Sequence, residues 1–255
     1  MQPKVSIITP AYNCADFIES TIESVLSQDY TNWEMIIVDD CSKDETVEII
    51  KKYQMTDKRI ILHQAQSNLG AAGARNKCLE LSTGRFIAYL DSDDLWTSDK
   101  LTKQVEFMIG NNYGFSCADY EVIDQYGNSK NKVIKMKKKS TYHGFLQNNL
   151  LQTVGIMVDL SIVSKNNLEM PKECWREDAA TWLQVLKNNH ICYGFNEVLG
   201  KYRRVENSLS SNKVKAAKGV WFLYREWEKL SLVYSIYCFS RYALLAIWKR
   251  CYFNN

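Results

Sequence analysis

This sequence lacks the features that identify several common classes of protein. Its formal net charge is only +3 at pH 7, which excludes a chain that binds nucleic acid through its overall charge. The eight cysteines form no C-x-x-C pair and no zinc-type spacing, and the first segment, MQPKVSIITPAYN, has no long apolar run typical of a signal peptide. No internal repeat or low-complexity linker is present. We therefore expect a cytoplasmic protein with free thiols, folded as one compact unit.

Two motifs of nucleotide-binding proteins are also missing. The segment N-L-G-A-A-G-A-R-N at 68–76 is rich in small residues, but no G-K-[ST] follows it, so it is not a phosphate-binding P-loop. No G-x-G-x-x-G follows the first expected strand, which excludes a dinucleotide-dependent dehydrogenase. The small residues favour close packing of a helix, and Arg75 could reach either the acids of a site or a phosphate.

The N-terminal part of the chain alternates between short apolar runs and segments with helical spacing. This alternation predicts an α/β fold with βαβ units and a mostly parallel central sheet flanked by helices. Ligands of such sheets bind beyond the carboxyl ends of the strands, so polar residues after the first, second and fourth strands are candidate site residues. The expected strands are 5–9, 35–38, 60–62 and 86–90, and helical spacing is found at 17–26, 47–50 and 71–81.

Polar side chains follow the first and second strands. Tyr12 can stack on a nucleobase, and Asn13 can cap the next helix. Asp39 and Asp40 form a like-charge pair, which is costly unless donors such as a base N–H and ribose hydroxyl groups are present. One of these acids could instead cap the following helix, a role that also suits Asp44. Both interpretations remain open from these residues alone.

Three acidic residues follow the fourth strand, in Y-L-D-S-D-D-L-W at 89–96. The carboxylates of Asp91, Asp93 and Asp94 repel one another, and a divalent cation would relieve that repulsion. Such oxygen ligands suit Mn²⁺ or Mg²⁺, which usually bind one or two carboxylates together with substrate phosphates and water. The spacing cannot form an EF-hand loop. An acidic turn that caps a helix is the alternative interpretation.

A later helix is expected to begin at two further acidic residues, Glu177 and Asp178. Acids in the first turn of a helix interact favourably with its dipole, so capping is one explanation for them. The functional interpretation is a general base, a carboxylate that takes a proton from an attacking hydroxyl group. The sequence offers this one candidate for a base and no second carboxylate motif placed as a nucleophile.

Five segments together resemble the family 2 glycosyltransferases of GT-A fold. In order they are V-S-I-I-T-P-A-Y-N, I-I-V-D-D-C-S-K-D, N-L-G-A-A-G-A-R-N, Y-L-D-S-D-D-L-W, and R-E-D with Trp182 four residues after its last acid. Each segment alone is weakly specific, but the five follow the family's order and spacing from residue 4 to about residue 190. The chain looks like the members that build bacterial surface polysaccharides such as O-antigen and capsule.

The resemblance implies roles for particular residues. Tyr12 would stack on the nucleobase, Asp40 would accept its N3–H, and Asp91 would lie near the ribose. Asp93, the last acid of the D-x-D unit, would ligate the Mn²⁺ or Mg²⁺ ion, and Asp178 would be the base. The expected donor-binding residues are Pro10, Tyr12, Asp39, Asp40, Asn68, Arg75, Asp91, Ser92, Arg203, Ser208 and Ser210, of which the last three match a segment near the diphosphate.

The reaction implied by the resemblance is an inverting, metal-dependent hexosyl transfer. The leaving nucleoside diphosphate would develop negative charge that the metal on Asp93 stabilises, while Asp178 deprotonates the attacking hydroxyl group of a saccharide. The expected donor is a UDP-hexose, and the expected acceptor is a saccharide linked to undecaprenyl diphosphate. Many relatives carry a histidine at about the position of Val205, so the resemblance supplies no second protein ligand for the metal.

Two other functions fit parts of the sequence. A sugar-phosphate nucleotidyltransferase would share an α/β fold and acids that bind Mg²⁺. It usually has a glycine-rich, basic phosphate loop, however, and residues 9–16 contain no glycine, lysine or arginine. A non-catalytic module that binds nucleotide sugars would not need both the acid cluster and Asp178.

We expect three functional parts in the chain. Residues 1–110 would form the nucleotide-sugar-binding half, with a Rossmann-like arrangement. Residues 111–211 would form a smaller acceptor-binding half that carries the catalytic base. Residues 212–255 would form a helical tail rich in aromatic and basic side chains.

The tail and a lysine-rich run could both contact a membrane surface. The stretch 230–248 is apolar and aromatic, but Arg241 lies in its middle, where a spanning helix would bury it at a cost of about 2.5–3.5 kcal/mol or more. We favour a helix that docks on the protein or lies in the interface of the cytoplasmic membrane, on its inner face. The lysines within 130–139 form either a solvated loop or a contact for anionic lipid or a diphosphate.

Overall fold

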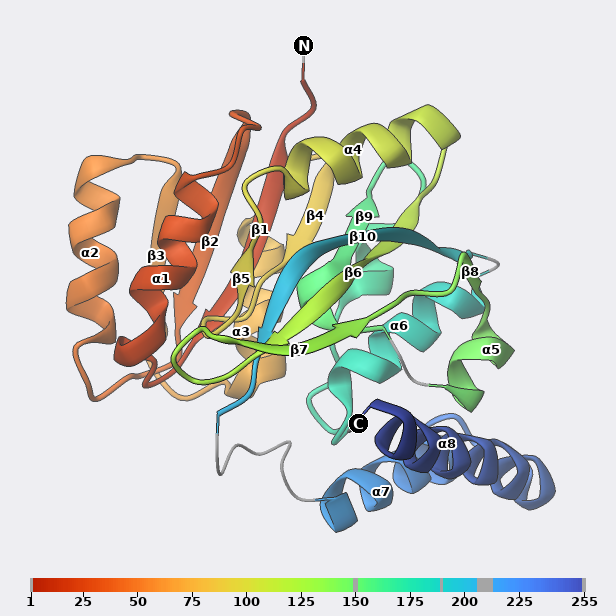
Figure 1. The fold of residues 1–255 in the computed structure, drawn as a ribbon. Coiled ribbons are helices and arrows are strands. Elements are labelled where there is room, and N and C mark those ends of the chain that lie inside the picture. Colours follow the sequence, from red (N-terminus) through yellow and green to blue (C-terminus); the bar gives the residue numbers. More distant parts are fainter. Residues whose placement is uncertain (1, 149–150, 189, 206–212, 254–255) are drawn as a thin grey trace.

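The computed structural model describes residues 2–148, 151–188, 190–205 and 213–253, which Figure 1 traces from the first strand to the last helix. The strands are β1 (Val5–Ala11), β2 (Trp33–Asp39), β3 (Ile60–Gln64), β4 (Phe86–Tyr89), β5 (Leu95–Trp96), β6 (Phe115–Ile123), β7 (Ser129–Ile134), β8 (Lys139–Ser140), β9 (Ile156–Asp159) and β10 (Cys192–Arg203). The α-helices are α1 (Ala15–Leu26), α2 (Thr46–Thr56), α3 (Gly70–Leu81), α4 (Lys100–Asn111), α5 (Tyr142–Gln147), α6 (Glu177–Lys187), α7 (Lys213–Phe222) and α8 (Leu232–Phe253). The shorter helices are the 3₁₀ turns η1 (Thr153–Gly155) and η2 (Lys165–Leu168) and the π-helix η4 (Leu223–Trp227).

Within the described residues, ten strands form one sheet in the order β3-β2-β1-β4-β9-β6-β10-β5, with β7 added to β6 and β8 added to β10. The pairs among β3, β2, β1 and β4 are parallel. Beyond β4 the pairs are antiparallel, except that β6 and β10 run parallel. The predicted α/β class is confirmed, but the sheet is mixed rather than mostly parallel. Part of the reason is local, because β6 and β7 are joined by a tight turn that permits only antiparallel pairing.

The four strands predicted in the N-terminal part are confirmed, with small differences at their ends. Every residue of β2 is buried, and in β1 only Pro10 is partly exposed. Parallel strands that are covered on both faces need continuous apolar runs, which is the pattern that these segments carry. Helix α3 packs on β1 and β2, and Figure 1 shows α1 on the opposite side of these strands.

The carboxyl ends of β1, β2 and β4 meet at one edge of the sheet, the lower edge in Figure 1. The register pairs Ala11 at the end of β1 with Asp39 at the end of β2, and Ile8 with Tyr89 at the end of β4. Polar residues that follow these strands therefore converge, as the alternating pattern predicts.

The late helix predicted in the second half of the chain is present, and a tight turn precedes it in the sequence. The turn at 124–128 joins β6 to β7, and α6 begins at Glu177. Trp182 of α6 contacts Tyr89 of β4 edge to face, with 5.2 Å between the ring centroids, and both side chains are buried. This aromatic contact holds the start of α6 close to the edge of the sheet that carries the candidate site.

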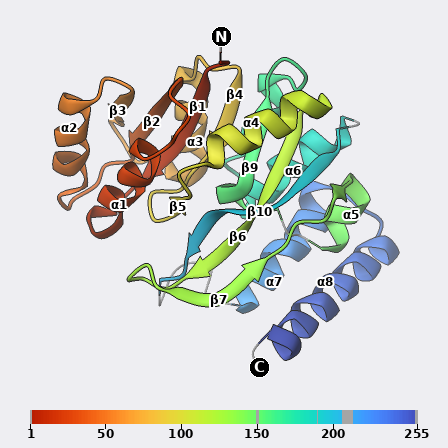
Figure 2. The same cartoon turned by 45° about the horizontal axis from the view of Figure 1, so that its top comes forward.

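The C-terminal helices α7, η4 and α8 dock on the protein beneath α5 and α6 (Figures 1 and 2). Glu228, just after η4, accepts a hydrogen bond from Tyr142 of α5 and pairs with Lys187 of α6 at 2.7 Å. On α8, Ser235 and Cys238 are fully buried. One face of the tail is therefore part of the packed protein, as in one of the two arrangements that we favour from the sequence.

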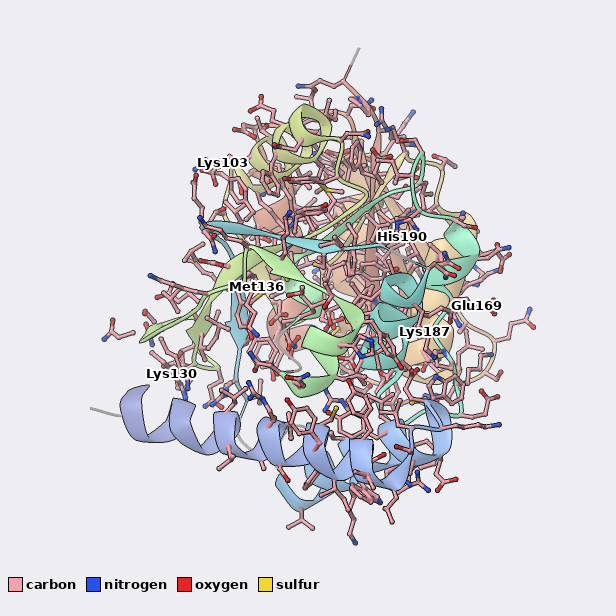
Figure 3. All side chains as sticks on the ribbon, turned by 90° about the vertical axis from the view of Figure 1, so that its right-hand side faces the viewer. Lys103, Lys130, Met136, Glu169, Lys187 and His190 are labelled. Carbon is pink, nitrogen blue, oxygen red and sulfur yellow. The ribbon has the colours of Figure 1, made fainter. Side chains whose placement is uncertain are left out.

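The opposite face of α8 is exposed and largely apolar. Among the described residues, no helix is long and apolar enough to cross a membrane. Figure 3 shows α8 running along the base of the molecule, with Lys130 and Lys187 above it in that view. The functional division at residues 110 and 211 stays a prediction, since one sheet continues across the first boundary. The exposed apolar residues of α8 are Leu232, Val233, Ile236, Tyr237 and Leu244.

Candidate active site

The loops that follow β1 and β2 are fastened to each other. Asn13 Oδ1 accepts a hydrogen bond from the backbone N–H of Lys43, at 2.7 Å. Asn13 has φ +46° and does not cap α1, whose N-cap residue is Cys14, so that prediction is wrong. An N-cap residue usually has extended backbone angles, which this left-handed position does not provide. The N-cap residue of α2 is Glu45 rather than the predicted Asp44, although Asp44 accepts from the backbone N–H of Thr46, the first residue of the helix, at 3.1 Å.

Asp40 caps α3, a helix that begins 30 residues later in the chain. Its two carboxylate oxygens accept from the backbone N–H groups of Leu69, at 2.5 Å, and Gly70, at 2.9 Å. Asn68 Oδ1 also accepts a hydrogen bond from the backbone N–H of Gly70, at 3.2 Å. Gly70 has φ +71°, a backbone conformation that glycine adopts without strain. Of the two interpretations of the pair Asp39 and Asp40, helix capping therefore applies to Asp40, because both of its oxygens already accept hydrogen bonds from α3.

Asp39 is placed differently from its neighbour. Its side chain is 3% exposed, and Oδ2 accepts from the backbone N–H of Ser42 at 3.3 Å. Within the described part of the chain, Oδ1 of Asp39 is buried and has no hydrogen-bond partner. Tyr12, which follows β1, is 53% exposed, and Pro10 is partly exposed. The buried acceptor Asp39 Oδ1 and the exposed ring of Tyr12 both lie at the carboxyl ends of the neighbouring strands β1 and β2. Together they suit a planar ligand that carries an N–H donor.

Arg75 joins the acid cluster to the start of α6. Its Nη2 lies 2.7 Å from Asp91 Oδ1, and its Nη1 lies 3.4 Å from Glu177 Oε1. Burial alone would lower the pKa of the guanidinium, but Asp91 and Glu177 together raise that pKa above its ordinary value. Burial and the neighbouring Asp178 also raise the pKa of the Glu177 carboxyl group. Of the two predicted partners of Arg75, the structure shows the site acids.

The acidic loop after β4 is held by its backbone. The hydroxyl group of Thr21 donates to the carbonyl oxygens of Ser92, at 3.0 Å, and Asp94, at 2.9 Å. Arg203 at the end of β10 donates from its backbone N–H to Asp94 Oδ1, at 2.8 Å, and from Nε to the carbonyl oxygen of Asp93, at 2.6 Å. These bonds fix the loop while leaving the side chain of Asp93 partly exposed.

The acids of this loop repel one another strongly enough to change their ionisation. Burial, followed by the charge of Asp91, raises the pKa of Asp93 to about 6. Burial, followed by the charges of Asp93 and Asp91, raises the pKa of Asp94 well above its usual value. Asp94 Oδ2 is also buried without a hydrogen-bond partner in the described residues. A divalent cation would relieve this repulsion, so the donor set fits the Mn²⁺ or Mg²⁺ ion expected from the sequence.

The protein side chains alone do not build a complete metal site. Over the ranges that the structure describes, no three His, Cys, Asp or Glu side chains are grouped to hold a metal ion. Mn²⁺ and Mg²⁺ commonly bind one or two carboxylates and complete their coordination with phosphate oxygens and water. The site therefore fits a cation that arrives with, or is completed by, a diphosphate.

Asp178 lies in the first turn of α6, where its carboxylate makes one long ion contact among the described residues. Its Oδ1 is 3.7 Å from Arg176 Nε, and its side chain is 24% exposed. The N-cap residue of α6 is Arg176, and no side-chain hydrogen bond caps this helix. The capping interpretation of Asp178 thus rests on the helix dipole alone. Its carboxylate is accessible enough to meet a substrate.

The remaining predicted residues have mixed outcomes. Ser208 and Ser210 lie outside the described residues. Arg203 directs its guanidinium at protein oxygens, since Nη1 donates to the carbonyl oxygen of Gln125 at 3.0 Å in addition to the bond from Nε. A contact between Arg203 and a diphosphate stays a prediction. Thr21 carries no signal of a site residue in the sequence, because it lies within an ordinary amphipathic helix.

Comparison with known proteins identifies the family of the chain. The family model "Glycosyl transferase family 2" matches residues 6–163. TuaG of Bacillus subtilis (strain 168), named as a glycosyltransferase of teichuronic acid biosynthesis, is 46% identical over 249 residues, which cover 98% of each chain. WfgD of Escherichia coli, named UDP-Glc:alpha-D-GlcNAc-diphosphoundecaprenol beta-1,3-glucosyltransferase, is 36% identical over 97% of this chain and 95% of its own.

Solved structures show the same fold at low sequence identity. A fragment of S. aureus TarS in complex with UDP-GlcNAc superposes with a TM-score of 0.71 at 20% identity, over 88% of this chain and 65% of that one. The mannosyltransferase PcManGT from Pyrobaculum calidifontis, in complex with GDP-Man and Mn2+, also gives 0.71, at 17% identity over 91% of this chain and 66% of that one. The chain therefore belongs to glycosyltransferase family 2, and it is a glycosyltransferase of GT-A fold.

Proposed function

We propose that this chain transfers a hexose from a UDP-sugar to a hydroxyl group of a saccharide carried on undecaprenyl diphosphate, with inversion and with the help of a divalent cation. The names of WfgD and of WfaP from Escherichia coli, which is 35% identical over 97% of this chain, support the donor and the lipid-linked acceptor. The complex of TarS with UDP-GlcNAc supports a uridine nucleotide in the donor. The product would enter the synthesis of a bacterial surface polysaccharide.

The observation that carries this proposal is the pair of ion contacts made by Arg75. Because one guanidinium reaches both Asp91 and Glu177, the acidic loop and the start of α6 lie on the two sides of one site. A donor diphosphate bound at the acidic loop would then face the carboxylate of Asp178. A binding module would need no such carboxylate opposite its ligand.

In the proposed reaction, one displacement forms the new glycosidic bond. The acceptor oxygen attacks the anomeric carbon as the bond from that carbon to the UDP oxygen breaks, and UDP leaves with the electron pair. Asp178 takes the proton of the acceptor hydroxyl group, whose own pKa is far too high for it to ionise near neutrality. A single attack from the face opposite the leaving group inverts the anomeric centre, so an α-linked donor gives a β-linked product.

Asp93 would hold the cation, because its side chain is the partly exposed member of the pair Asp93 and Asp94. When bound, a divalent cation supplies positive charge that stabilises the leaving diphosphate. Arg75 keeps Asp91 oriented beside this loop at 2.7 Å. We infer from the acids present and from the Mn2+ in the PcManGT complex that Mn²⁺ or Mg²⁺ serves here.

The exposed face of α8 suggests where the enzyme meets the membrane that carries its acceptor. Val233 is 80% exposed and Leu244 is 66% exposed, while Cys238 on the other side of the helix is buried. A helix that docks with one face and presents apolar side chains on the other can lie in the interface of a bilayer. We infer peripheral contact with the inner face of the cytoplasmic membrane.

The nucleobase is expected to interact with Asp39 more than with Asp40. The resemblance assigns the N3–H to Asp40, but both oxygens of that residue cap α3, whereas Asp39 Oδ1 has no donor in the described residues. Asp39→Asn should weaken UDP binding about tenfold or more, the scale of one hydrogen bond to a charged group. The variant has one acceptor oxygen in place of two, so it cannot accept a hydrogen bond from Ser42 N–H and another from the nucleobase. Isothermal titration with UDP measures the effect.

Asp40→Asn is the matched variant for this test. It should lower the free energy of unfolding by about 0.5–2 kcal/mol, the usual cost of a lost cap, with a smaller effect on UDP affinity. If Asp40→Asn loses UDP binding while Asp39→Asn binds UDP like the wild type, the base is held by Asp40, as the resemblance implies.

The proposed function is tested by transfer from a panel of sugar nucleotides to a synthetic saccharide diphosphate lipid. We expect a new glycoside with a UDP-hexose and Mn²⁺, and a β linkage by NMR when the donor is α-linked. Donor hydrolysis without acceptor serves as a separate readout of donor binding. Retention of the anomeric configuration, or full activity in excess chelator, would contradict the proposed mechanism.

A further inference from the structure

An apolar groove runs along α7 beside the segment that carries the proposed base. It has a volume of about 630 Å³. Trp175 and Phe222 stack at one place on its wall, with centroids 5.7 Å apart, and Trp221 and Phe239 contact edge to face at another, with centroids 5.6 Å apart. The lining residues are Trp175, Val214, Ala217, Lys218, Trp221, Phe222, Glu226 and Phe239.

We propose that this groove binds the hydrocarbon chain of the lipid diphosphate acceptor, next to its phosphate groups. This inference rests on the proposed function, because it names the part of the acceptor that the groove recognises. A hydrocarbon chain needs apolar contact and no hydrogen bonds, and the lining matches that need, since two charged side chains, Lys218 and Glu226, accompany six apolar ones.

One lining residue of the groove belongs to the segment that leads into the proposed base. Trp175, which is 61% exposed, stands three residues before Asp178. Arg176 lies between them, with Nε 3.7 Å from Asp178 Oδ1. On its other side, Arg176 packs on α7 so closely that a Cβ atom on Gly219 would lie 3.3 Å from its Cγ. A lipid chain in the groove would therefore place its first sugar within reach of Asp178.

Two positive charges near the groove suit the polar end of a lipid diphosphate, although the lining also carries the acidic Glu226. Lys218 is exposed on the lining, and Arg176 carries a second positive charge at the end nearest the base. Cations beside an apolar channel recognise an anionic headgroup attached to a hydrocarbon chain, whereas a neutral apolar partner would gain nothing from them.

A stripe of apolar side chains on α8 leads from the groove toward the exposed apolar face. Phe239 lines the groove, and Ile236 and Leu232 lie three and seven residues before it, which places all three on one stripe of the helix. Ile236 is 50% exposed and Leu232 is 54% exposed. A long chain could thus leave the groove along α8 and enter the bilayer on which α8 rests in the proposed function.

The test compares two acceptors with the same saccharide α-diphosphate, one esterified with a long alkyl chain and the other with a methyl group. The full chain should show a KM about tenfold lower, or more, for the long-chain acceptor, the effect expected from burying roughly two methylene groups. Ala217→Trp, which fills the groove, should remove this difference and leave KM for the methyl acceptor and donor hydrolysis unchanged. Trp221→Ala should weaken the preference in the same direction.

Ser240→Trp is the matched control, since it adds the same side chain to an exposed position of α8 that does not line the groove. It should keep the full preference for the long chain. Equal KM values for the two acceptors in the wild type, or a preference that survives Ala217→Trp, would overturn the inference while the proposed function stands. The inference also fails if Ala217→Trp abolishes binding to phospholipid vesicles but leaves the two KM values in their wild-type ratio.

If neither acceptor is glycosylated, that result counts against the proposed function alone. Direct binding of a lipid diphosphate then still tests the groove. Farnesyl diphosphate should quench the fluorescence of the wild-type tryptophans with saturable binding, and Ala217→Trp should bind it at least about tenfold more weakly. Equal binding of farnesyl diphosphate by the two proteins would contradict a lipid groove. So would a wild type that self-associates, if the weaker binding by the variant is explained by the loss of that association.

Discussion

Asp178→Asn is expected to lower kcat about 10²–10⁴-fold, the usual contribution of a general base. Asparagine has nearly the same shape as aspartate but cannot take the proton from the acceptor hydroxyl group. Among the described residues, Asp178 makes one ion contact, at 3.7 Å from Arg176, and no capping bond, so the variant should fold normally. The loss of a negative charge from the first turn of α6 costs about 0.3–1 kcal/mol. Steady-state kinetics with saturating donor and acceptor measure kcat.

Donor affinity separates this interpretation from a general loss of structure. Asp178→Asn should bind the UDP-sugar with nearly the wild-type Kd, since the base acts on the acceptor. Glu177→Gln is the matched control, because Glu177 points at Arg75, at 3.4 Å, and its replacement should reduce kcat less. If Asp178→Asn keeps more than about a tenth of wild-type kcat, an effect below the range for a base, the proton goes elsewhere and Glu177 becomes the candidate.

Asp93→Ala is expected to remove metal-dependent donor binding and to lower kcat by about 10²–10³-fold or more, the scale for losing one preorganised electrostatic group. Burial and Asp91 raise the pKa of Asp93 from its ordinary value of 3.8 to about 6. The metal-free fold therefore loses stability as the pH rises between these two values, and the whole penalty is present at pH 7. Alanine should therefore not lower the melting temperature at pH 7 without metal. Titration of the UDP-sugar with and without Mn²⁺ measures the loss.

Asp99→Ala is a suitable control, because Asp99 lies six residues further on and pairs with Lys103 at 2.8 Å. It should keep the wild-type dependence on Mn²⁺. An Asp93→Ala protein that still binds donor more tightly in Mn²⁺ would show that the cation is held by other groups.

The N-terminal half of the fold follows from local patterns. Strands β1 and β2 are buried on both faces, so they must be continuous apolar runs, and such runs are visible in the sequence. The second half is less predictable. β9 inserts between β4 and β6, and β10 pairs with β6, through contacts between segments far apart in the chain. Nothing in the hydrophobic period of a short strand specifies which neighbour it takes.

Capping shows the same limit on a smaller scale. The rule for helix caps uses the residues just before a helix, and for α2 it selects Asp44, which accepts from the first N–H of the helix but lies one residue before the N-cap Glu45. Asp40 instead caps α3, whose first N–H groups lie 29 and 30 residues away. The rule fails for Asn13 because a left-handed backbone turns its side chain toward the neighbouring loop.

The sequence by itself determined the family, the βαβ order and the chemical types at each strand end, because those depend on residues close together in the chain. Only the tertiary structure decided how these groups are combined. Arg75 meets Asp91 16 residues away and Glu177 102 residues away, and the aromatic groove forms between the segment before α6 and two C-terminal helices. Such contacts depend on the packing of whole elements, since burial and charge pairing act through space rather than along the chain.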